Sequence, residues 1–316
     1  LLCLIFNTFF SFLSFFVFLS FFLWNNSTSQ LKRYPTEVFK NILDVLGKPY
    51  DEVKHLDLTH FPYFEKIQQV NGRNSTQISL NPSDENARAY ILPEEIMAMF
   101  LKEALAMAST KAGSKVVDCV VVVPNFYTHH QRQALLDAAK IAEVDILGFL
   151  NGNTAAALTY GLNRDKEELE VHRRVLIYDM GYGSTKVSVI EMKQGEDQKK
   201  NKTVPVIQVI GHGWDASLGG RDFDLRIAQF FAQQAEKKVG EGKILGNKRT
   251  LERLVKESQR VKEVLSANVD TQISIPDLVP DYDFFGSITR EQFEEASKDL
   301  LIRSIEPAKR ALESEQ

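Results

Sequence analysis

A short stretch near the middle of the chain carries the residues best suited to binding a phosphate group. Asp179 ends the apolar run 175–178, and Gly181, Gly183 and Ser184 follow it. Glycines after a strand let the backbone turn and present its N–H groups, and a concave row of N–H groups binds anions. The Asp179 carboxylate could then hold a hydrated Mg²⁺ ion that bridges the phosphates. A plain β-hairpin with a glycine turn explains the same pattern without any ligand.

Two later segments could complete a nucleotide site, and each also has an ordinary structural explanation. The glycine-containing stretch 211–215 precedes Gly219 and Gly220, which open a helix whose N-terminus could face an anion. On a later helix, Lys262 and Ser266 share one face through i,i+4 spacing and could hydrogen-bond a sugar and a base. A flexible helix entry and a solvated helix face would look the same, so neither segment identifies a ligand by itself.

Composition and charge fit an ordinary globular protein and exclude several kinds of site. The 316 residues are 44% hydrophobic and 25% charged, and the net charge of −4 favours no nucleic-acid partner. The two cysteines, Cys3 and Cys119, exclude a disulfide framework and a cysteine-based zinc site. Cys119 lies in the apolar run 116–123 and is predicted to be a buried thiol. His129 and His130 start a helix, where adjacent side chains diverge, so they are predicted to be surface residues.

The first residues differ in character from the rest of the chain. Residues 1–24 are almost wholly apolar, rich in phenylalanine and uncharged, and that length could span a bilayer. Three interpretations stay open: a signal anchor, a long signal-peptide core, or a segment that is not native, so that a membrane partner follows only if the segment is native. Glycosylation sequons begin at Asn25, Asn26, Asn74 and Asn201, and they would matter only in the secretory pathway. Asn74 and Asn201 are expected to lie in exposed segments.

Alternating helical and strand patterns predict an α/β fold. The expected helices are 93–113, 128–142, 155–160, 223–239, 249–265 and 289–314, and the expected strands are 116–123, 146–150, 175–179, 186–192 and 204–210. The valine-rich strand 116–123 is expected to be largely buried on both faces. The charged segment 163–174 is expected to connect a first lobe, 34–162, to a second lobe, 175–316.

Several helix ends carry local signals. The segments 128–131 and 289–292 each begin with threonine and end with glutamine, which is the pattern of a capping box. Asn153 and Thr154 can cap the helix 155–160, and Gly161 can end that helix. Pro307 is expected to break or kink the last helix.

The order of these motifs resembles the ATPase domain of the seventy-kilodalton heat-shock chaperones. The matching segments are 120–124, 131–133, 151–161, 179–185, 218–224, 260–266 and 287–293. The resemblance covers about residues 34–316, and 151–161 and 179–185 are most similar to the large, hypoxia-up-regulated branch of the endoplasmic reticulum. It implies an actin-like, two-lobed α/β ATPase fold, incomplete at both ends, that binds ATP or ADP with Mg²⁺.

The resemblance also implies roles for individual residues. Asp179 corresponds to the acidic residue near Mg²⁺ and the phosphates, and Ser184 to the hydroxyl residue of the phosphate turn. The positions implied to contact the nucleotide are Gly181, Tyr182, Gly183, Gly219, Gly220, Lys262 and Ser266. The implied catalytic residues are therefore Asp179 and Ser184, with Asp179 as the metal ligand.

The chain departs from the family pattern at several of these positions. Gly152 replaces a glutamate, Lys186 replaces the second acidic residue of the phosphate hairpin, and Glu263 replaces an arginine that packs on adenine. Tyr182 stands where a glycine is usual. The first phosphate loop is expected before residue 34, where the apolar segment stands instead, and the catalytic lysine is not identifiable. Because hydrolysis needs Mg²⁺ and a positioned water, we expect weak nucleotide binding and little or no ATP hydrolysis.

The resemblance implies a chaperone of the endoplasmic-reticulum lumen. Its expected partners are unfolded client proteins and a lumenal heat-shock chaperone, on which it would also act in nucleotide exchange. Two alternatives remain: a small-molecule kinase of the same superfold, and a non-catalytic, membrane-tethered scaffold. Phosphoryl transfer to a small molecule would identify the first alternative, and absence of nucleotide binding would favour the second.

Overall fold

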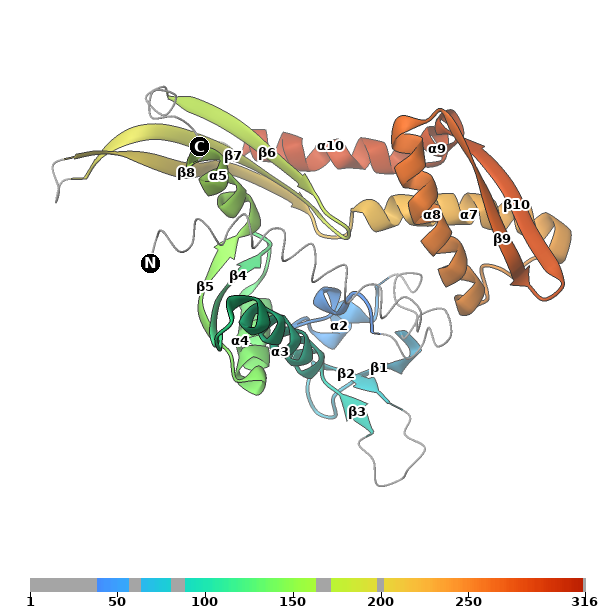
Figure 1. The fold of residues 1–316 in the computed structure, drawn as a ribbon, viewed down its shortest axis with the longest axis horizontal. Coiled ribbons are helices and arrows are strands. Elements are labelled where there is room, and N and C mark those ends of the chain that lie inside the picture. The colour runs from blue at the N-terminus through green and yellow to red at the C-terminus, as the bar shows by residue number, and fades with distance from the viewer. Residues whose placement is uncertain (1–38, 57–63, 81–88, 163–171, 198–201, 315–316) are drawn as a thin grey trace. The chain divides into compact units, whose positions relative to one another are not determined.

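The computed structural model describes residues 39–56, 64–80, 89–162, 172–197 and 202–314 (Figure 1). The described residues form two compact units, the first up to residue 120 with 127–148 and the second comprising 121–126 with the residues from 149 onward. The apolar segment 1–24 lies outside the described residues. Among the residues that are described, no helix is both long enough and apolar enough to cross a membrane.

The first unit combines short helical turns, a small sheet and two longer helices. Its elements are η2 (Ile42–Asp44), α2 (Tyr50–Val53), η4 (Phe64–Lys66), β1 (Ile67–Gln69), β2 (Thr76–Ser79), β3 (Tyr90–Ile91), α3 (Pro93–Ala112) and α4 (His129–Ala142). The three strands pair antiparallel in the order β1–β2–β3. Val45, Val53 and Ile78 are fully buried in its core, and Ile96 of α3 packs beside them.

The ends of α3 and α4 follow the local signals of the sequence. Pro93 occupies the first turn of α3, and Gly113 ends that helix with a left-handed φ of 67°, which glycine adopts without strain. The capping box at 128–131 is confirmed, with the Thr128 hydroxyl accepting a hydrogen bond from the backbone N–H three residues later. His129 and His130 are exposed, as expected.

Strands β4 (Asp118–Val123) and β5 (Asp145–Asn151) are hydrogen-bonded neighbours, connected in sequence by α4. The expectation that β4 is largely buried on both faces is wrong, because Val120 and Val122 are 51% and 53% exposed. On the opposite face of the strand, Cys119 and its neighbour Ile146 pack against the hydrophobic cluster formed by α3 and α4. Only one face of the strand is covered, so Cys119 is partly buried, and this burial raises the pKa of its thiol.

The second unit contains an antiparallel sheet in the order β6–β7–β8, and two helices pack against it (Figure 1). Its first elements are α5 (Gly152–Leu162), β6 (Arg173–Met180), β7 (Thr185–Asp197) and β8 (Lys202–Asp215). Helix α5 packs Ala157 on Ile190 and Met192, whereas α10 (Lys298–Glu313) packs on Val187 and Val189. Successive side chains of a strand point to opposite faces, so the two helices cover opposite faces of β7.

Helix α5 differs from the sequence-based expectation at its start. Asn153 lies inside the helix and does not cap it, because its side-chain amide donates to the Ser188 hydroxyl at 3.1 Å. Gly161 is the last residue but one of the helix, which ends at Leu162, close to the predicted end. The helix groups with the second unit by its contacts. The predicted connection 163–174 lies largely outside the described residues, so the boundary between the two lobes stays a prediction.

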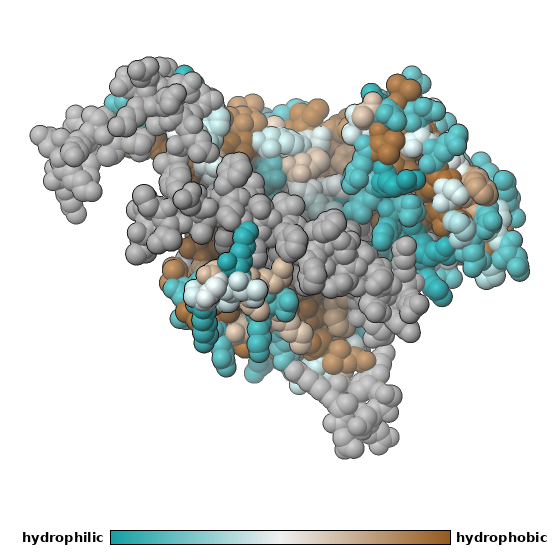
Figure 2. Space-filling model, in the orientation of Figure 1, coloured by the Kyte–Doolittle hydropathy of each residue, from teal (hydrophilic) through white to brown (hydrophobic). Residues whose placement is uncertain are grey.

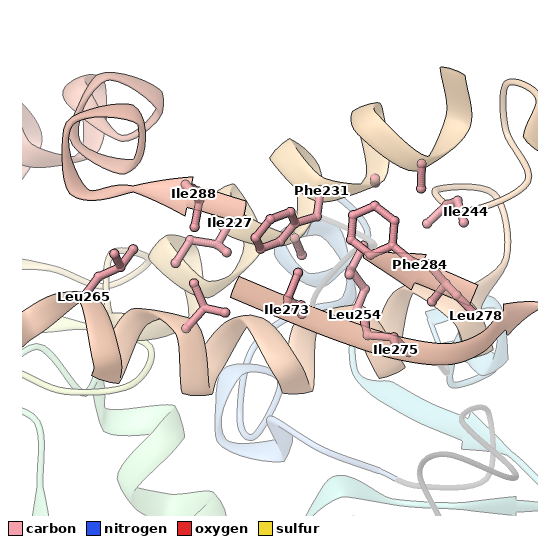
Figure 3. Close-up of a cluster of buried hydrophobic side chains, with 14 residues drawn as sticks. Ile227, Phe231, Ile244, Leu254, Leu265, Ile273, Ile275, Leu278, Phe284 and Ile288 are labelled. Carbon is pink, nitrogen blue, oxygen red and sulfur yellow. The ribbon is translucent and has the colours of Figure 1, made fainter. Parts of the chain in front are cut away.

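The rest of the second unit is built around one hydrophobic cluster. Its elements are α7 (Gly220–Val239), α8 (Lys248–Ala267), β9 (Asp270–Val279), β10 (Tyr282–Thr289) and α9 (Arg290–Ala296). Phe231 of α7 and Phe284 of β10 meet edge to face near the centre of the cluster, with ring centroids 5.7 Å apart (Figure 3). Full burial of each such side chain contributes about 1.5–3 kcal/mol. In Figure 2 the surface of this region is mainly hydrophilic, with scattered hydrophobic side chains.

The last helical segment is interrupted at Ser297 and not at Pro307. The capping box at 289–292 is confirmed, and it starts the short helix α9. Helix α10 then begins after Ser297 and continues through Pro307, which is buried within it. The helical segment was therefore predicted to break at Pro307, but it breaks at Ser297.

Candidate functional site

The turn between β6 and β7 folds directly against the first turn of α7. The Gly181 N–H donates to the Ser184 carbonyl at 2.9 Å, which closes the turn. The N–H groups of Gly220 and Arg221 donate to the carbonyls of Gly181 and Tyr182, each at 2.9 Å. The first N–H groups of a helix have no partner within it, so the turn satisfies two of them. The structure thus brings together two glycine motifs that lie far apart in the sequence.

Gly219 makes this contact possible because nothing larger fits at its position. A Cβ atom there would lie 2.6 Å from the Gly183 nitrogen and 2.5 Å from the Tyr182 carbonyl carbon. Its φ of −159° is ordinary extended backbone, so the requirement is steric and not conformational. The Thr185 hydroxyl also donates to the Leu218 carbonyl at 2.8 Å, which fixes the chain just before the glycine pair.

An ion pair between Asp179 and Lys186 lies at the base of the turn. The two residues face each other across the β6–β7 ladder, with the ammonium nitrogen 2.8 Å from the carboxylate oxygen Oδ2. The Lys186 side chain is 15% exposed and that of Asp179 is 45% exposed. A Cβ at Gly181 would be 3.8 Å from the ammonium, so glycine leaves room around it.

This ion pair bears on the prediction that Asp179 ligates Mg²⁺. Lys186 places a positive charge 2.8 Å from Oδ2 of this carboxylate, and that charge would repel a metal ion at the same carboxylate. In the described part of the chain, no group of three or more histidine, cysteine, aspartate or glutamate residues is arranged to hold a metal ion. The ion pair therefore disfavours ligation of Mg²⁺ through Oδ2 of Asp179, and the metal-ligand role of this residue stays a prediction.

Lys262 ties α8 to the start of α7. Its ammonium donates to the Gly220 carbonyl at 3.1 Å and lies 2.7 Å from Oδ1 of Asp224. The Asp224 side chain is only 1% exposed, and desolvation raises the pKa of its carboxyl group, while the Lys262 ammonium opposes that rise. The structure therefore places Lys262 beside the glycine pair Gly219 and Gly220. Its two contacts there, with the Gly220 carbonyl and with Asp224, join α8 to α7.

Arg221 is a residue of this region that the sequence analysis did not single out. It is 7% exposed, and its guanidinium lies 3.1 Å from the position that a Cβ at Gly183 would occupy. With Lys186 and Lys262 it makes three cationic side chains around the turn. The sequence shows only that an arginine directly follows the glycine pair. The burial of Arg221 depends on the long-range contact between the turn and α7.

For two other predicted site residues, Ser266 and Ser184, the structure gives no side-chain contact with the turn. The Ser266 hydroxyl is exposed and donates to the Glu263 carbonyl of its own helix at 2.6 Å. Ser184 contributes its backbone carbonyl, which closes the turn. The catalytic role of Ser184 and the nucleotide contact of Ser266 stay predictions.

The stretch 211–215 has a packing role in β8 and does not form a glycine-rich loop. A Cβ at Gly211 would overlap the Ala311 carbonyl oxygen, and one at Gly213 would overlap the Pro307 carbonyl oxygen. These glycines let α10 lie directly on the strand. Between them, His212 is exposed and its ring stacks on Trp214 with centroids 5.6 Å apart.

Comparison with known proteins shows which sequences share this pattern. The family model described as Hsp70 protein matches residues 25–316. Heat shock 70 kDa protein 17 of Arabidopsis thaliana is 35% identical over 284 residues, which are 89% of this chain and 32% of that protein. Hypoxia up-regulated protein 1 is 33% identical in Danio rerio, over 88% of this chain and 28% of the relative, and 33% identical in Xenopus tropicalis, over 89% and 43%. The chain thus spans less than half the length of these relatives.

Proposed function

Because this chain belongs to the Hsp70 family, we propose that it binds ATP or ADP and couples the bound nucleotide to the handling of unfolded client proteins. The nucleotide-binding domain of this family has the actin-like ATPase fold, which agrees with the α/β architecture. The observation that carries the proposal is the packing of the turn 181–184 on the start of α7 through Gly219, with Lys186, Arg221 and Lys262 around it. Such a turn suits a polyphosphate, because the cationic side chains around it attract phosphate oxygens.

We expect this chain to bind ATP and ADP weakly and to release little or no phosphate from ATP. Gly152 and Lys186 stand where the family has acidic residues, so no carboxylate at these positions can order the attacking water. Loss of one well-placed polar group in an active site costs roughly 10²–10³ in rate. Calorimetry with each nucleotide, together with a phosphate-release assay, measures both properties.

A pair of charge variants tests whether binding occurs at the turn. Gly183→Asp adds a carboxylate beside Arg221 and should abolish nucleotide binding. Gly72→Asp makes the same charge change in an exposed turn of the first unit, where a Cβ meets nothing within 4 Å. Its φ of +73° favours glycine, so thermal unfolding checks that this variant folds, and its binding should be unchanged. Tight binding that depends on Mg²⁺, with steady turnover, would contradict the proposed weak site.

We further propose that the chain resides in the endoplasmic-reticulum lumen, and the sequon at Asn74 provides a test. Asn74 is exposed, and its side-chain oxygen accepts the Asp51 N–H at 3.2 Å, whereas a glycan attaches to the amide nitrogen. We expect glycosylation at Asn74 in a secretory host. Asn201 lies outside the described residues and stays a second predicted site.

The measurement is the electrophoretic mobility before and after endoglycosidase treatment. The enzyme should increase the mobility of the native sequence, and Asn74→Gln should remove one glycosylation step. Unchanged mobility of the product from the secretory pathway would contradict a lumenal location.

The proposed partners are unfolded proteins and a second heat-shock chaperone of the lumen, for which the chain would promote nucleotide exchange. The ion pair between Asp179 and Lys186 favours one competing function, a non-catalytic scaffold, because it leaves less room for a catalytic metal. Absence of nucleotide binding with and without Mg²⁺ would favour that scaffold. Phosphoryl transfer to a small molecule would instead indicate a kinase of the same superfold.

A further inference from the structure

We propose that the Lys186 ammonium serves as the built-in counter-cation of the phosphate turn, so that this chain binds nucleoside di- and triphosphates without a divalent metal ion. This inference rests on the proposed nucleotide-binding function and defines the chemical form of the ligand. The chain would bind the free, metal-depleted polyphosphate in preference to its Mg²⁺ complex.

The position of Lys186 is set by the strand ladder. Its partner across the ladder is Asp179 on one side and Trp214 on the other, so the lysine stands on the central strand of the sheet. The side chain is 15% exposed, and its ammonium reaches the carboxylate at 2.8 Å. The aliphatic part of the Lys186 side chain is therefore held by the sheet, while its ammonium lies at the turn. Gly181 has no side chain that would crowd this ammonium.

The two ion pairs of this region differ in a way that singles out Lys186. The Lys262 ammonium is committed to the Gly220 carbonyl and to Asp224, which is 1% exposed. The partner of Lys186, in contrast, is 45% exposed and faces water. An ammonium has three N–H donors, so Lys186 can keep its contact with Asp179 and also donate to a phosphate oxygen.

The charge of the ligand determines which form this site prefers. A free polyphosphate carries more negative charge than its Mg²⁺ complex, so a fixed ammonium attracts the free form more strongly. A metal ion delivered with the nucleotide would approach a carboxylate that the ammonium already contacts, and the two cations would repel each other. The fixed cation therefore replaces the metal in neutralising the phosphates.

Calorimetry of the 316-residue chain with ADP and with ATP, in EDTA and in excess Mg²⁺, tests the inference. We expect the affinity in EDTA to exceed that in Mg²⁺ by about threefold or more. Lys186→Gln should lower the affinity in EDTA about tenfold or more, because a hydrogen bond between charged groups is lost. Lys186→Asp should make binding depend on Mg²⁺, since two adjacent carboxylates repel a free polyphosphate and can ligate the metal.

Lys193→Gln is the matched control. Lys193 lies on the same strand and forms an ion pair with Glu191 at 2.7 Å, so the change removes the same charge from a similar contact away from the turn. Nucleotide affinity should be unchanged, and thermal unfolding checks that each variant folds. Binding by the native sequence that requires Mg²⁺, or an equal loss in both glutamine variants, would overturn the inference while leaving nucleotide binding intact. Absence of binding under both conditions would overturn the proposed function as well.

Discussion

Replacing Lys262 with methionine is expected to lower the free energy of unfolding by about 3 kcal/mol at neutral pH, because breaking a buried ion pair leaves an uncompensated charge. The carboxylate left without its partner is that of Asp224, which is 1% exposed and in the native protein lies 2.7 Å from the Lys262 ammonium. The change also removes the hydrogen bond from Lys262 to the Gly220 carbonyl. Denaturant-induced unfolding of the native sequence and the variant measures the difference.

The loss should depend on pH in a defined direction. Desolvation already raises the pKa of Asp224 in the folded chain above its unfolded value, so ionisation of this group opposes folding. Removing Lys262 raises that folded pKa further. Protonation relieves the buried charge, so the difference in stability between the two proteins should be largest at neutral pH and should shrink as the pH falls through the raised pKa of the variant.

Two further variants control this experiment. Adding Asp224→Asn to Lys262→Met removes the buried charge and should recover part of the lost stability. Lys298→Met removes a lysine from an exposed pair with Glu295, at 3.8 Å, and should change stability by no more than about 0.5 kcal/mol. A loss in Lys262→Met that is the same at neutral and acidic pH would contradict the role assigned to the ion pair.

Replacing Gly219 with alanine should separate the β6–β7 turn from α7. The new Cβ would lie 2.5–2.6 Å from backbone atoms of Tyr182 and Gly183, which cannot move without breaking the contact. We expect a loss of stability of about 1–3 kcal/mol, as for other overpacked sites. Nucleotide binding should be lost with it, since the arrangement of the turn depends on the hydrogen bonds to Gly220 and Arg221.

The neighbouring glycine is the control for this variant. At Gly220 the nearest atom to a Cβ is the Lys262 ammonium at 3.2 Å, the end of a flexible side chain that can adjust. Gly220→Ala should therefore lower stability and nucleotide binding less than Gly219→Ala does. Equal effects of the two substitutions in unfolding and calorimetry would show that the close backbone contact is unimportant.

Features that depend on neighbouring residues were predictable from the sequence alone. The β6–β7 hairpin around Gly181, the capping boxes at 128–131 and 289–292, and the helix that ends at Gly113 all appear where the pattern places them. Each rests on interactions within a few residues, or on a strand pair joined by a short turn. The motif order was also enough to indicate the Hsp70 family and its fold class.

Contacts between distant segments decided the rest. The absence of a side chain at Gly213 admits the backbone of Pro307, which lies far along the chain. The Asn153 side chain bonds Ser188 and does not cap its helix. No local pattern distinguishes a glycine that approaches a ligand from one that admits a helix. Likewise, the sequence by itself determined that Lys186 stands at an acidic position of the family. Only the tertiary structure decided that its ammonium meets Asp179, because that contact depends on the register of the two strands.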